Sequence, residues 1–180
     1  GMFPDKEEVQ GVLNAPGAWH FFLSHTQRDG DAKVLATELW SESRKYYNMA
    51  SWLDVKMQTR DMSAMKEGVE NSDVFIAIIT NNGKDSYFSR PMCRQEIMWA
   101  VKAGKKIVPV CLGDDKKRIG EFIAEAKKWA QDRQLGDLPE DPETVGLAWP
   151  DFGPLNFVTY DGSDDLLAKA GQAARVRVIG

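Results

Sequence analysis

Residues 74–79 read Val-Phe-Ile-Ala-Ile-Ile, an unbroken apolar run that ends at the turn sequence Thr80-Asn81-Asn82-Gly83. A short run that is apolar at every position is typical of a central strand in a parallel sheet, where both faces are buried. Residues 20–24 form a second, aromatic-rich strand, and residues 107–112 form a third. We therefore expect residues 74–79 to lie inside a parallel sheet.

Segments with helical periodicity alternate with these strands. One apolar stripe comprises Ala32, Leu35, Ala36 and Leu39, and others fall within residues 62–69, 93–104 and 119–130. Two further strands are predicted at residues 50–53 and 155–160, and a last helix at residues 166–174. Alternating strands and helices predict a parallel sheet with helices on both faces. The expected fold class is α/β, with a flavodoxin-like five-stranded parallel sheet.

Two segments depart from regular periodicity. Pro109 lies within the strand predicted at residues 107–112, and proline has no N–H for a ladder, so we expect a bulge or an unpaired side there. Residues 135–154 form a proline-rich segment without convincing periodicity. A connection of that length predicts either a functional loop or a short helix near residues 145–149.

The composition is that of an ordinary soluble chain. The 180 residues are 43% hydrophobic and 28% charged, and the net charge is −4, so the chain is long enough for one well-buried core. The acidic balance argues against a protein whose main partner is nucleic acid or an anionic membrane surface. No apolar run has the length needed to span a bilayer, so we expect no membrane contact in this segment.

We expect one domain over residues 19–175, with an N-terminal extension or linker at residues 1–18 and a C-terminal tail at residues 176–180. The two cysteines, Cys93 and Cys111, both lie in apolar segments and lack the spacing of a metal site. Buried free thiols are typical of a reducing compartment. The sequence therefore predicts a cytoplasmic protein without a metal.

Glu96 is the strongest candidate for a residue that performs chemistry. At about 100° per residue it lies at the edge of the apolar stripe formed by Cys93, Ile97, Ala100, Val101 and Gly104. A carboxyl there loses hydration, and its pKa depends on the neighbouring cleft. From the helix alone, the favoured interpretation is structural, with Glu96 as a border residue paired with a nearby Arg or Lys.

The expected topology bears on whether the role of Glu96 is structural or functional. A flavodoxin-like sheet binds its ligands beyond the carboxyl ends of its strands. We therefore expect the loops after Ser24, Leu53 and Thr80 to form the cleft. The helix that carries Glu96 begins at the same end of the sheet, which favours a functional role for this carboxyl.

Several segments, taken together, resemble the Toll/interleukin-1 receptor (TIR) domain family. They are Phe21-Phe22-Leu23-Ser24-His25, Asp54 at the end of the second predicted strand, residues 73–79, Glu96-Ile97 and residues 104–110. Their order and spacing make the resemblance specific, and it extends over roughly residues 19–112. It implies the TIR fold, and it gives Pro109 a precedent, since the family carries proline in this strand.

The TIR family has two functional classes. Some members are adaptors that signal by assembling with other TIR domains, and others cleave NAD+ to nicotinamide and ADP-ribose or a cyclic ADP-ribose. In the cleaving class a glutamate on the third helix is catalytic, and Glu96 matches that position. The resemblance therefore implies a TIR-domain NAD+ nucleosidase, a glycohydrolase or cyclase, in immune or cell-death signalling.

The same resemblance implies the substrate and the partners. NAD+ is the substrate and no separate cofactor is expected, while copies of the chain self-associate through TIR-TIR contacts, build a composite site and also contact other TIR domains. The main alternative is a non-catalytic TIR adaptor that acts by TIR-TIR assembly. A further alternative is another flavodoxin-like glycosyl-transferring enzyme, such as a relative of the nucleoside deoxyribosyltransferases, which also use a glutamate.

By resemblance, residues at the end of the first strand contact the substrate. Ser24, His25 and Arg28 lie where the family places groups that contact the phosphates or the nicotinamide. A surface arginine is more often simply solvated, and this alternative stays open for Arg28.

Two further positions match the family's site. Asp54 and the loop to Asp61 match the BB loop, which borders the nicotinamide side of the site, although a turn or cap role for Asp54 is an equal alternative. Cys93 resembles the plant-type arrangement of cysteine, two residues, then glutamate. Met92 stands where other members have tryptophan, which leaves open which residue packs against the ribose.

Overall fold

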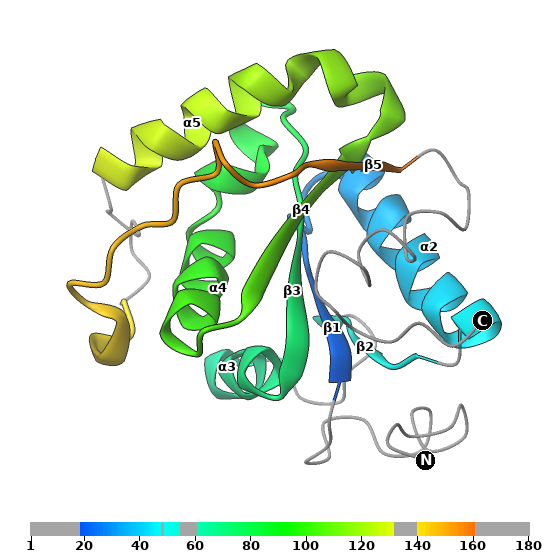
Figure 1. The fold of residues 1–180 in the computed structure, drawn as a ribbon, viewed down its shortest axis with the longest axis horizontal. Coiled ribbons are helices and arrows are strands. Elements are labelled where there is room, and N and C mark those ends of the chain that lie inside the picture. The colour runs from blue at the N-terminus through cyan, green and yellow to red at the C-terminus, as the bar shows by residue number, and fades with distance from the viewer. Residues whose placement is uncertain (1–18, 48, 55–60, 132–139, 161–180) are drawn as a thin grey trace.

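The computed structural model describes residues 19–47, 49–54, 61–131 and 140–160, and its centre is a five-stranded sheet (Figure 1). All strand pairs are parallel, in the order β2-β1-β3-β4-β5. The strands are β1 (Trp19–Ser24), β2 (Ser51–Trp52), β3 (Ser72–Ile78), β4 (Lys106–Leu112) and β5 (Val158–Tyr160). This is the flavodoxin-like order, so the predicted fold class is confirmed.

The middle strand is β3, as its apolar sequence predicts. Phe75 is in register with Phe22 of β1 on one side and with Ile107 of β4 on the other. Successive side chains of a strand point to opposite faces, so Phe75 packs into one hydrophobic core and Ile76 into the other. Both faces of β3 are buried, which explains why its sequence has no polar alternation.

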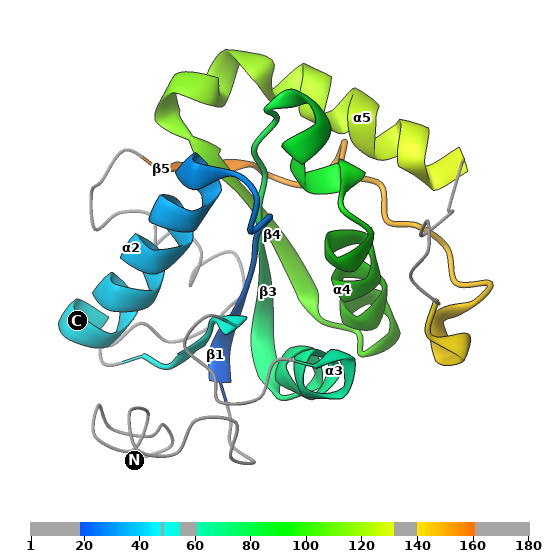
Figure 2. The ribbon, with the colours of Figure 1, turned by 180° about the vertical axis from the view of Figure 1, so that it is seen from behind.

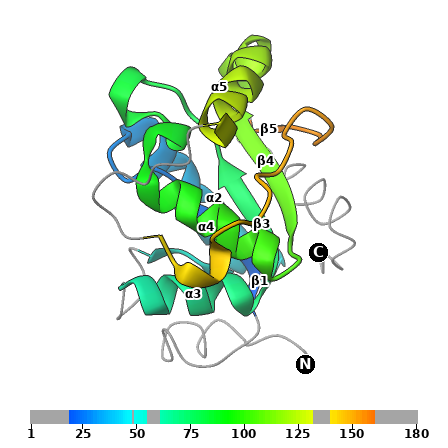
Figure 3. The ribbon, with the colours of Figure 1, turned by 90° about the vertical axis from the view of Figure 1, so that its left-hand side faces the viewer.

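Helices cover both faces of the sheet, as predicted. One face packs against α2 (Gly30–Tyr47) and the other against α3 (Met62–Glu70), α4 (Pro91–Lys102) and α5 (Ile119–Gln131). Figures 1 and 2 show α2 on one side of the strands and α3 and α4 on the other, and in Figure 3 these two helices lie in front of the sheet. Among the described helices, none combines the length and apolarity that a membrane crossing requires.

Some predicted segments lie outside the described residues. These are the N-terminal extension at residues 1–18, the helix at residues 166–174 with the end of the predicted domain, and the C-terminal tail at residues 176–180. Short 3-10 turns complete the described chain at η2 (Gly83–Asp85), η3 (Tyr87–Ser89), η4 (Gly113–Arg118) and η5 (Pro142–Thr144).

Pro109 lies inside β4, where its ring nitrogen is turned away from β3. The Val110 carbonyl accepts a hydrogen bond from the Ile79 N–H at 2.8 Å, so the backbone groups of Val110 face β3. Backbone groups alternate in direction along a strand, and Pro109 therefore faces the β5 side. Within the described residues, pairing with β5 begins only at Val110, which confirms the expected unpaired side.

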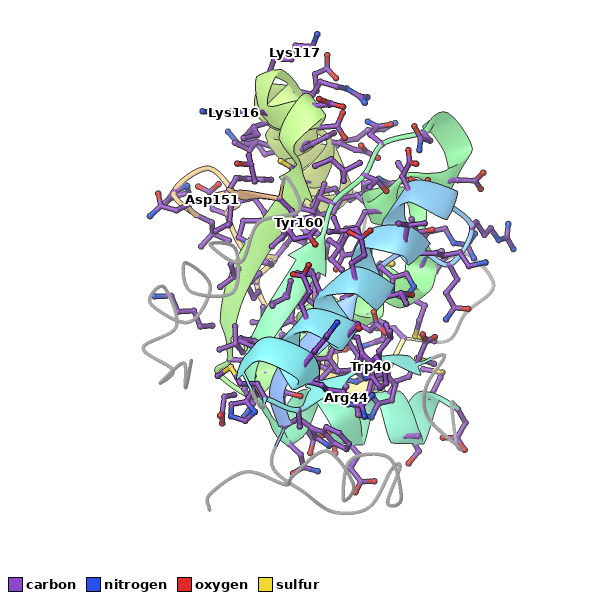
Figure 4. The ribbon with its side chains drawn as sticks, turned by 90° about the vertical axis from the view of Figure 1, so that its right-hand side faces the viewer. Trp40, Arg44, Lys116, Lys117, Asp151 and Tyr160 are labelled. Carbon is purple, nitrogen blue, oxygen red and sulfur yellow. The ribbon has the colours of Figure 1, made fainter. Side chains whose placement is uncertain are left out.

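The last strand is shorter than the sequence predicts. Leu155 belongs to a turn in which its N–H donates to the Phe152 carbonyl at 3.2 Å, so β5 spans Val158–Tyr160 and not residues 155–160. The Tyr160 hydroxyl donates to Glu42 of α2 at 2.9 Å. Figure 4 shows the Tyr160 side chain beside α2, so this edge strand is tied to the helix that covers its face.

The prediction of a short helix near residues 145–149 is wrong in its position. The structure instead has the turn η5, which begins at Pro142. Asp141 caps this turn by accepting a hydrogen bond from the Glu143 N–H at 3.0 Å. Gly146 follows with φ of 85°, a left-handed conformation that favours glycine and prevents the helix from continuing.

Candidate active site

A cleft of about 380 Å³ opens where β1 and β2 end, beside the start of α4. The predicted site residues that line it are His25, Arg28, Asp54, Cys93 and Glu96. The remaining lining residues are Leu23, Thr26, Gln27, Trp52, Met65, Arg90 and Met92. This is the end of the sheet at which flavodoxin-like folds bind ligands, as the sequence predicts.

The ends of α4 are fixed by its own sequence. Pro91 is the first residue of the helix. A backbone N–H at this position has no acceptor within the helix, so proline loses no hydrogen bond there. Gly104, just beyond the helix, has φ of 67°, which suits a glycine at a helix end. Between these points Cys93 and Ile97 pack into the core, while Glu96 reaches the cleft wall.

The carboxyl of Glu96 is buried, with 6% of the residue exposed. Burial raises its pKa from the ordinary 4.5 to about 8; a hydrogen bond from Ser24 opposes this rise, and the nearby Asp54 carboxylate adds to it. The ion pairs found within the described ranges join other residues, so the structural interpretation of Glu96 as the partner of an Arg or Lys has no support there. A carboxyl that burial perturbs in a cleft is typical of a functional site.

Two hydroxyl groups lie behind Glu96. Ser24, the last residue of β1, donates from Oγ to Glu96 Oε1 at 2.7 Å. The hydroxyl of Tyr87 in η3 lies 2.8 Å from the same Oγ. Ser24 is not among the residues that line the cleft, so its predicted contact with substrate stays a prediction. Sequence reasoning missed Tyr87, although it lies shortly before Glu96 in the chain.

Charged and polar groups line the same cleft as Glu96. His25 and Asp54 are each 7% exposed; burial lowers the pKa of His25, and the Asp54 carboxylate opposes that shift. Oδ1 of Asp54 is buried without a hydrogen-bond partner in the described part of the chain. Arg28 is exposed and Arg90 half-buried, and both line the cleft. A ligand with hydrogen-bond donors and an anionic portion matches this set.

The loop that follows Asp54, residues 55–60, lies outside the described residues. The predicted match of Asp54 and this loop to the BB loop therefore stays a prediction. The position of Asp54 does agree with the expected cleft, since it follows β2 directly and lines the cavity.

The expected contribution of the loop after Thr80 needs correction. Of the lining residues described, Arg90 alone comes from this loop. Glu125 of α5 holds the loop by accepting hydrogen bonds from Asn81 at 2.8 Å and from Ser86 at 2.6 Å. These contacts draw the first part of the loop toward α5 and away from the cleft.

The thiol of Cys93 lines the cleft but is not an activated nucleophile. Burial raises its pKa well above the usual range, and the Glu96 carboxylate adds to the shift. A thiol needs a lowered pKa to act as a thiolate near neutral pH. In the part of the chain that the structure describes, no group of three or more His, Cys, Asp or Glu side chains is placed to hold a metal ion.

An apolar wall completes the cleft. Trp52 is 1% exposed and stacks on Phe22 with ring centroids 4.7 Å apart, so it belongs to the core and to the cleft at once. Met65 and Met92 complete this wall. Met92 therefore lies where apolar contact with a ligand is available, although the sequence lacks the tryptophan that the family resemblance would place there.

Comparison with known protein families now adds to this geometry. A family model described as TIR domain matches residues 21–145, well over half of the 180 residues. The match includes every residue that lines the cleft. A comparison with curated proteins finds no match. The chain therefore belongs to the TIR domain family, a family of signalling domains.

Proposed function

We propose that the chain is an NAD+ nucleosidase, a hydrolase that breaks the bond between nicotinamide and ribose with Glu96 as its catalytic residue. The observation that carries the proposal is the buried Glu96 carboxyl in the wall of a cleft at the carboxyl end of the sheet. Membership of the TIR family supports it, since that family includes NAD+-cleaving members. The activity would serve immune or cell-death signalling.

The reaction requires a fixed negative charge at the ribose. Nicotinamide is cationic in NAD+ and leaves as a neutral group with the electron pair of the C1′–N bond, so its departure needs no proton. The ribose becomes an oxocarbenium-like cation, which the Glu96 carboxylate stabilises. Water then forms a bond to C1′ and releases a proton, which gives ADP-ribose. Attack by the adenine of the same molecule gives the cyclic product.

The rest of the cleft suits the different parts of NAD+. Among the described lining residues, Arg28 and Arg90 are the cations available to the pyrophosphate, and Oδ1 of Asp54, which has no partner there, accepts a hydrogen bond from a ribose hydroxyl or the carboxamide. Trp52 and Met92 offer apolar contact to a flat ring or the ribose. Association with a second copy, or with another TIR domain, would complete a composite site around these groups.

Nicotinamide release is the direct test. Concentrated protein is incubated with NAD+ and the products are separated by chromatography, with Glu96→Ala beside the wild type. We expect release by the wild type and a loss of at least about 100-fold in the variant, because the stabilising charge is gone. Glu67→Ala, on the exposed face of α3, is the matched control and should retain activity.

Two outcomes would contradict this function. Equal release by the wild type and by Glu96→Ala would exclude Glu96 as the catalytic residue. No release by either protein, even when crowding or a solid support forces assembly, would favour the non-catalytic adaptor.

The pH dependence of the reaction follows from the ionisation of Glu96. Because the pKa of Glu96 is raised to about 8, its carboxyl is mostly protonated at pH 7 in the empty cleft. Cleavage needs the carboxylate, so kcat/KM should rise about tenfold per pH unit below pH 8 and reach a plateau above it. Initial rates at low NAD+ concentration between pH 5.5 and pH 9.5 measure this profile. A plateau that already begins at pH 5.5 would show that the reacting carboxyl has an ordinary pKa.

A further inference from the structure

The carboxyl of Glu96 has a buried side that the cleaving reaction does not use. On that side, within the described residues, its hydrogen bond comes from Ser24 Oγ at 2.7 Å, and Ser24 in turn lies 2.8 Å from the Tyr87 hydroxyl. Tyr87 is fully buried and does not line the cleft, so its hydroxyl is out of reach of a substrate. The three side chains come from β1, η3 and α4, which meet only in the folded protein.

The directions of these hydrogen bonds follow from counting hydrogens. A serine hydroxyl has one hydrogen, and Ser24 gives it to Glu96. The contact between Ser24 and Tyr87 must then be a donation from the tyrosine. The opposite arrangement would leave Glu96 without its donor and, among the described residues, the buried phenol hydrogen without an acceptor. Burial raises the pKa of Tyr87 well above its usual range, so the phenol keeps this hydrogen.

We infer that Tyr87 is a positioning residue that acts on Glu96 through Ser24. It fixes Oε1 of Glu96 as a hydrogen-bond acceptor, so that the carboxyl gains and loses its proton at Oε2, the oxygen left to the cleft. The catalytic relevance of these hydrogen bonds between Tyr87, Ser24 and Glu96 rests on the proposed function. The hydrogen bonds themselves do not depend on that function.

Tyr87 is held firmly enough to perform this role. Its backbone N–H donates to the Thr80 carbonyl at 3.0 Å, and the preceding Ser86 donates to Glu125 of α5 at 2.6 Å. Its ring meets the Phe88 ring edge-on, with centroids 5.2 Å apart. These contacts fix the ring without involving the hydroxyl, so Tyr87→Phe removes the hydrogen bond and leaves the packing in place.

The expected effect has a definite sign. A donor to the ionised carboxylate lowers its pKa, and donation by Tyr87 strengthens donation by Ser24, because linked hydrogen bonds polarise one another. Without the tyrosine hydroxyl, the pKa of Glu96 therefore rises.

Several elements around the cleft contribute titratable or charged groups that face Glu96. The cleft itself is lined by His25 and Arg28 after β1, Asp54 after β2, Arg90 in the loop before α4 and Cys93 in α4, while α3 contributes Met65, which does not titrate. Tyr87 of η3 lies behind Glu96. The pKa of His25 is lowered and that of Cys93 is raised well above its usual range, so neither overlaps the titration of Glu96 near pH 8.

The test follows the Glu96 carboxyl directly. The full chain is labelled with carbon-13 at glutamate side-chain carboxyls, titrated by NMR, and the Glu96 signal is assigned by its loss in Glu96→Gln. In Tyr87→Phe we expect the midpoint to move upward by about 0.5 to 1 pH unit. Correspondingly, kcat/KM at pH 7 should fall about three- to tenfold and approach the wild-type value above pH 9.5.

A matched control removes the same atom elsewhere. Tyr160→Phe also deletes a buried hydroxyl that donates to a glutamate, Glu42, but on the far side of the fold. It should leave the Glu96 midpoint unchanged. Ser24→Ala removes the hydrogen bond from Ser24 to Glu96 itself. It should shift the Glu96 midpoint at least as far as Tyr87→Phe, which keeps the test decisive if the tyrosine variant does not fold.

The results separate the inference from the proposed function. An unchanged midpoint in Tyr87→Phe, or an equal shift in Tyr160→Phe, overturns the positioning role. A loss of rate that is the same at every pH, without a shift in midpoint, also overturns it, because packing alone would explain such a loss. If the wild type releases no nicotinamide, the proposed function fails, while the NMR midpoints still decide the role of Tyr87.

Discussion

Glu96→Gln is expected to stabilise the folded protein above pH 8 while it lowers NAD+ cleavage by about 100- to 1000-fold. The two effects have one cause, because a buried negative charge that assists the reaction is costly to the fold. Glutamine keeps the shape and the acceptor oxygen for Ser24, and it removes the charge. Activity and stability should therefore change in opposite directions in a single variant.

The sign of the stability change follows from proton linkage. The pKa of Glu96 is about 8 in the folded protein and near 4.5 in an unfolded chain, so the folded state holds this proton more tightly. Raising the pH from 4.5 to 8 therefore destabilises the wild type relative to Glu96→Gln, and below pH 4.5 the difference disappears. At about 1.4 kcal/mol per tenfold change in proton affinity, the full gain above pH 8 is at most about 5 kcal/mol.

Urea unfolding at pH 5, 7 and 9 measures this gain. The free energy of unfolding of Glu96→Gln should exceed that of the wild type most at pH 9 and least at pH 5. Glu67→Gln, the same change on an exposed helix face, should alter stability by less than about 0.5 kcal/mol at every pH. A Glu96→Gln variant that gains nothing between pH 5 and pH 9 would show that the carboxyl is not buried in solution.

Gly68→Ala is expected to destabilise the protein by about 1 to 3 kcal/mol, although alanine is the better helix former. A Cβ atom at Gly68 would lie 2.7 Å from Cε2 and 2.8 Å from Nε1 of Trp52. The indole cannot easily move, because it stacks on Phe22 and is almost fully buried. Since Trp52 also lines the cleft, a displaced indole should raise KM for NAD+ as well.

The control for this variant is the same substitution at an open position. Gly120, the second residue of α5, has no atom within 4 Å of where its Cβ would be. Gly120→Ala should therefore be neutral or stabilising by up to about 1 kcal/mol. Thermal unfolding of both variants checks the contrast, and a stable Gly68→Ala protein would mean that Trp52 moves more freely than its packing indicates.

The parts of the fold that depend on local sequence could be predicted. The apolar run at residues 74–79 and the helical stripes give the alternation of strands and helices, and this alternation with the expected topology places Glu96 near the cleft. The stripe also indicates that Glu96 borders a buried surface. Such patterns depend on residues close together in the chain, where periodicity carries the information.

The partners of Glu96 could not be predicted in the same way. Ser24 is 72 residues away from Glu96 in the sequence and 63 residues away from Tyr87, and no local pattern reports contacts of this kind. The loop after Thr80 shows the same limit, because it is drawn from the cleft by Glu125, far along the chain. The position of η5, by contrast, is indicated by local sequence. Asp141 before Pro142 is a turn signal, which a search for periodicity does not detect.

The short length of the outer strand β5 has an energetic consequence for the neighbouring strand β4. Pro109 is buried, and in the described part of the chain the β5 side of the ladder begins just after it. Any other residue there would bring a backbone donor into the interior, and a buried donor without an acceptor costs about 1 to 3 kcal/mol. Proline has no such hydrogen to leave unsatisfied. The outer strand can therefore begin only after this point, and the short β5 and the proline of β4 form a single adaptation.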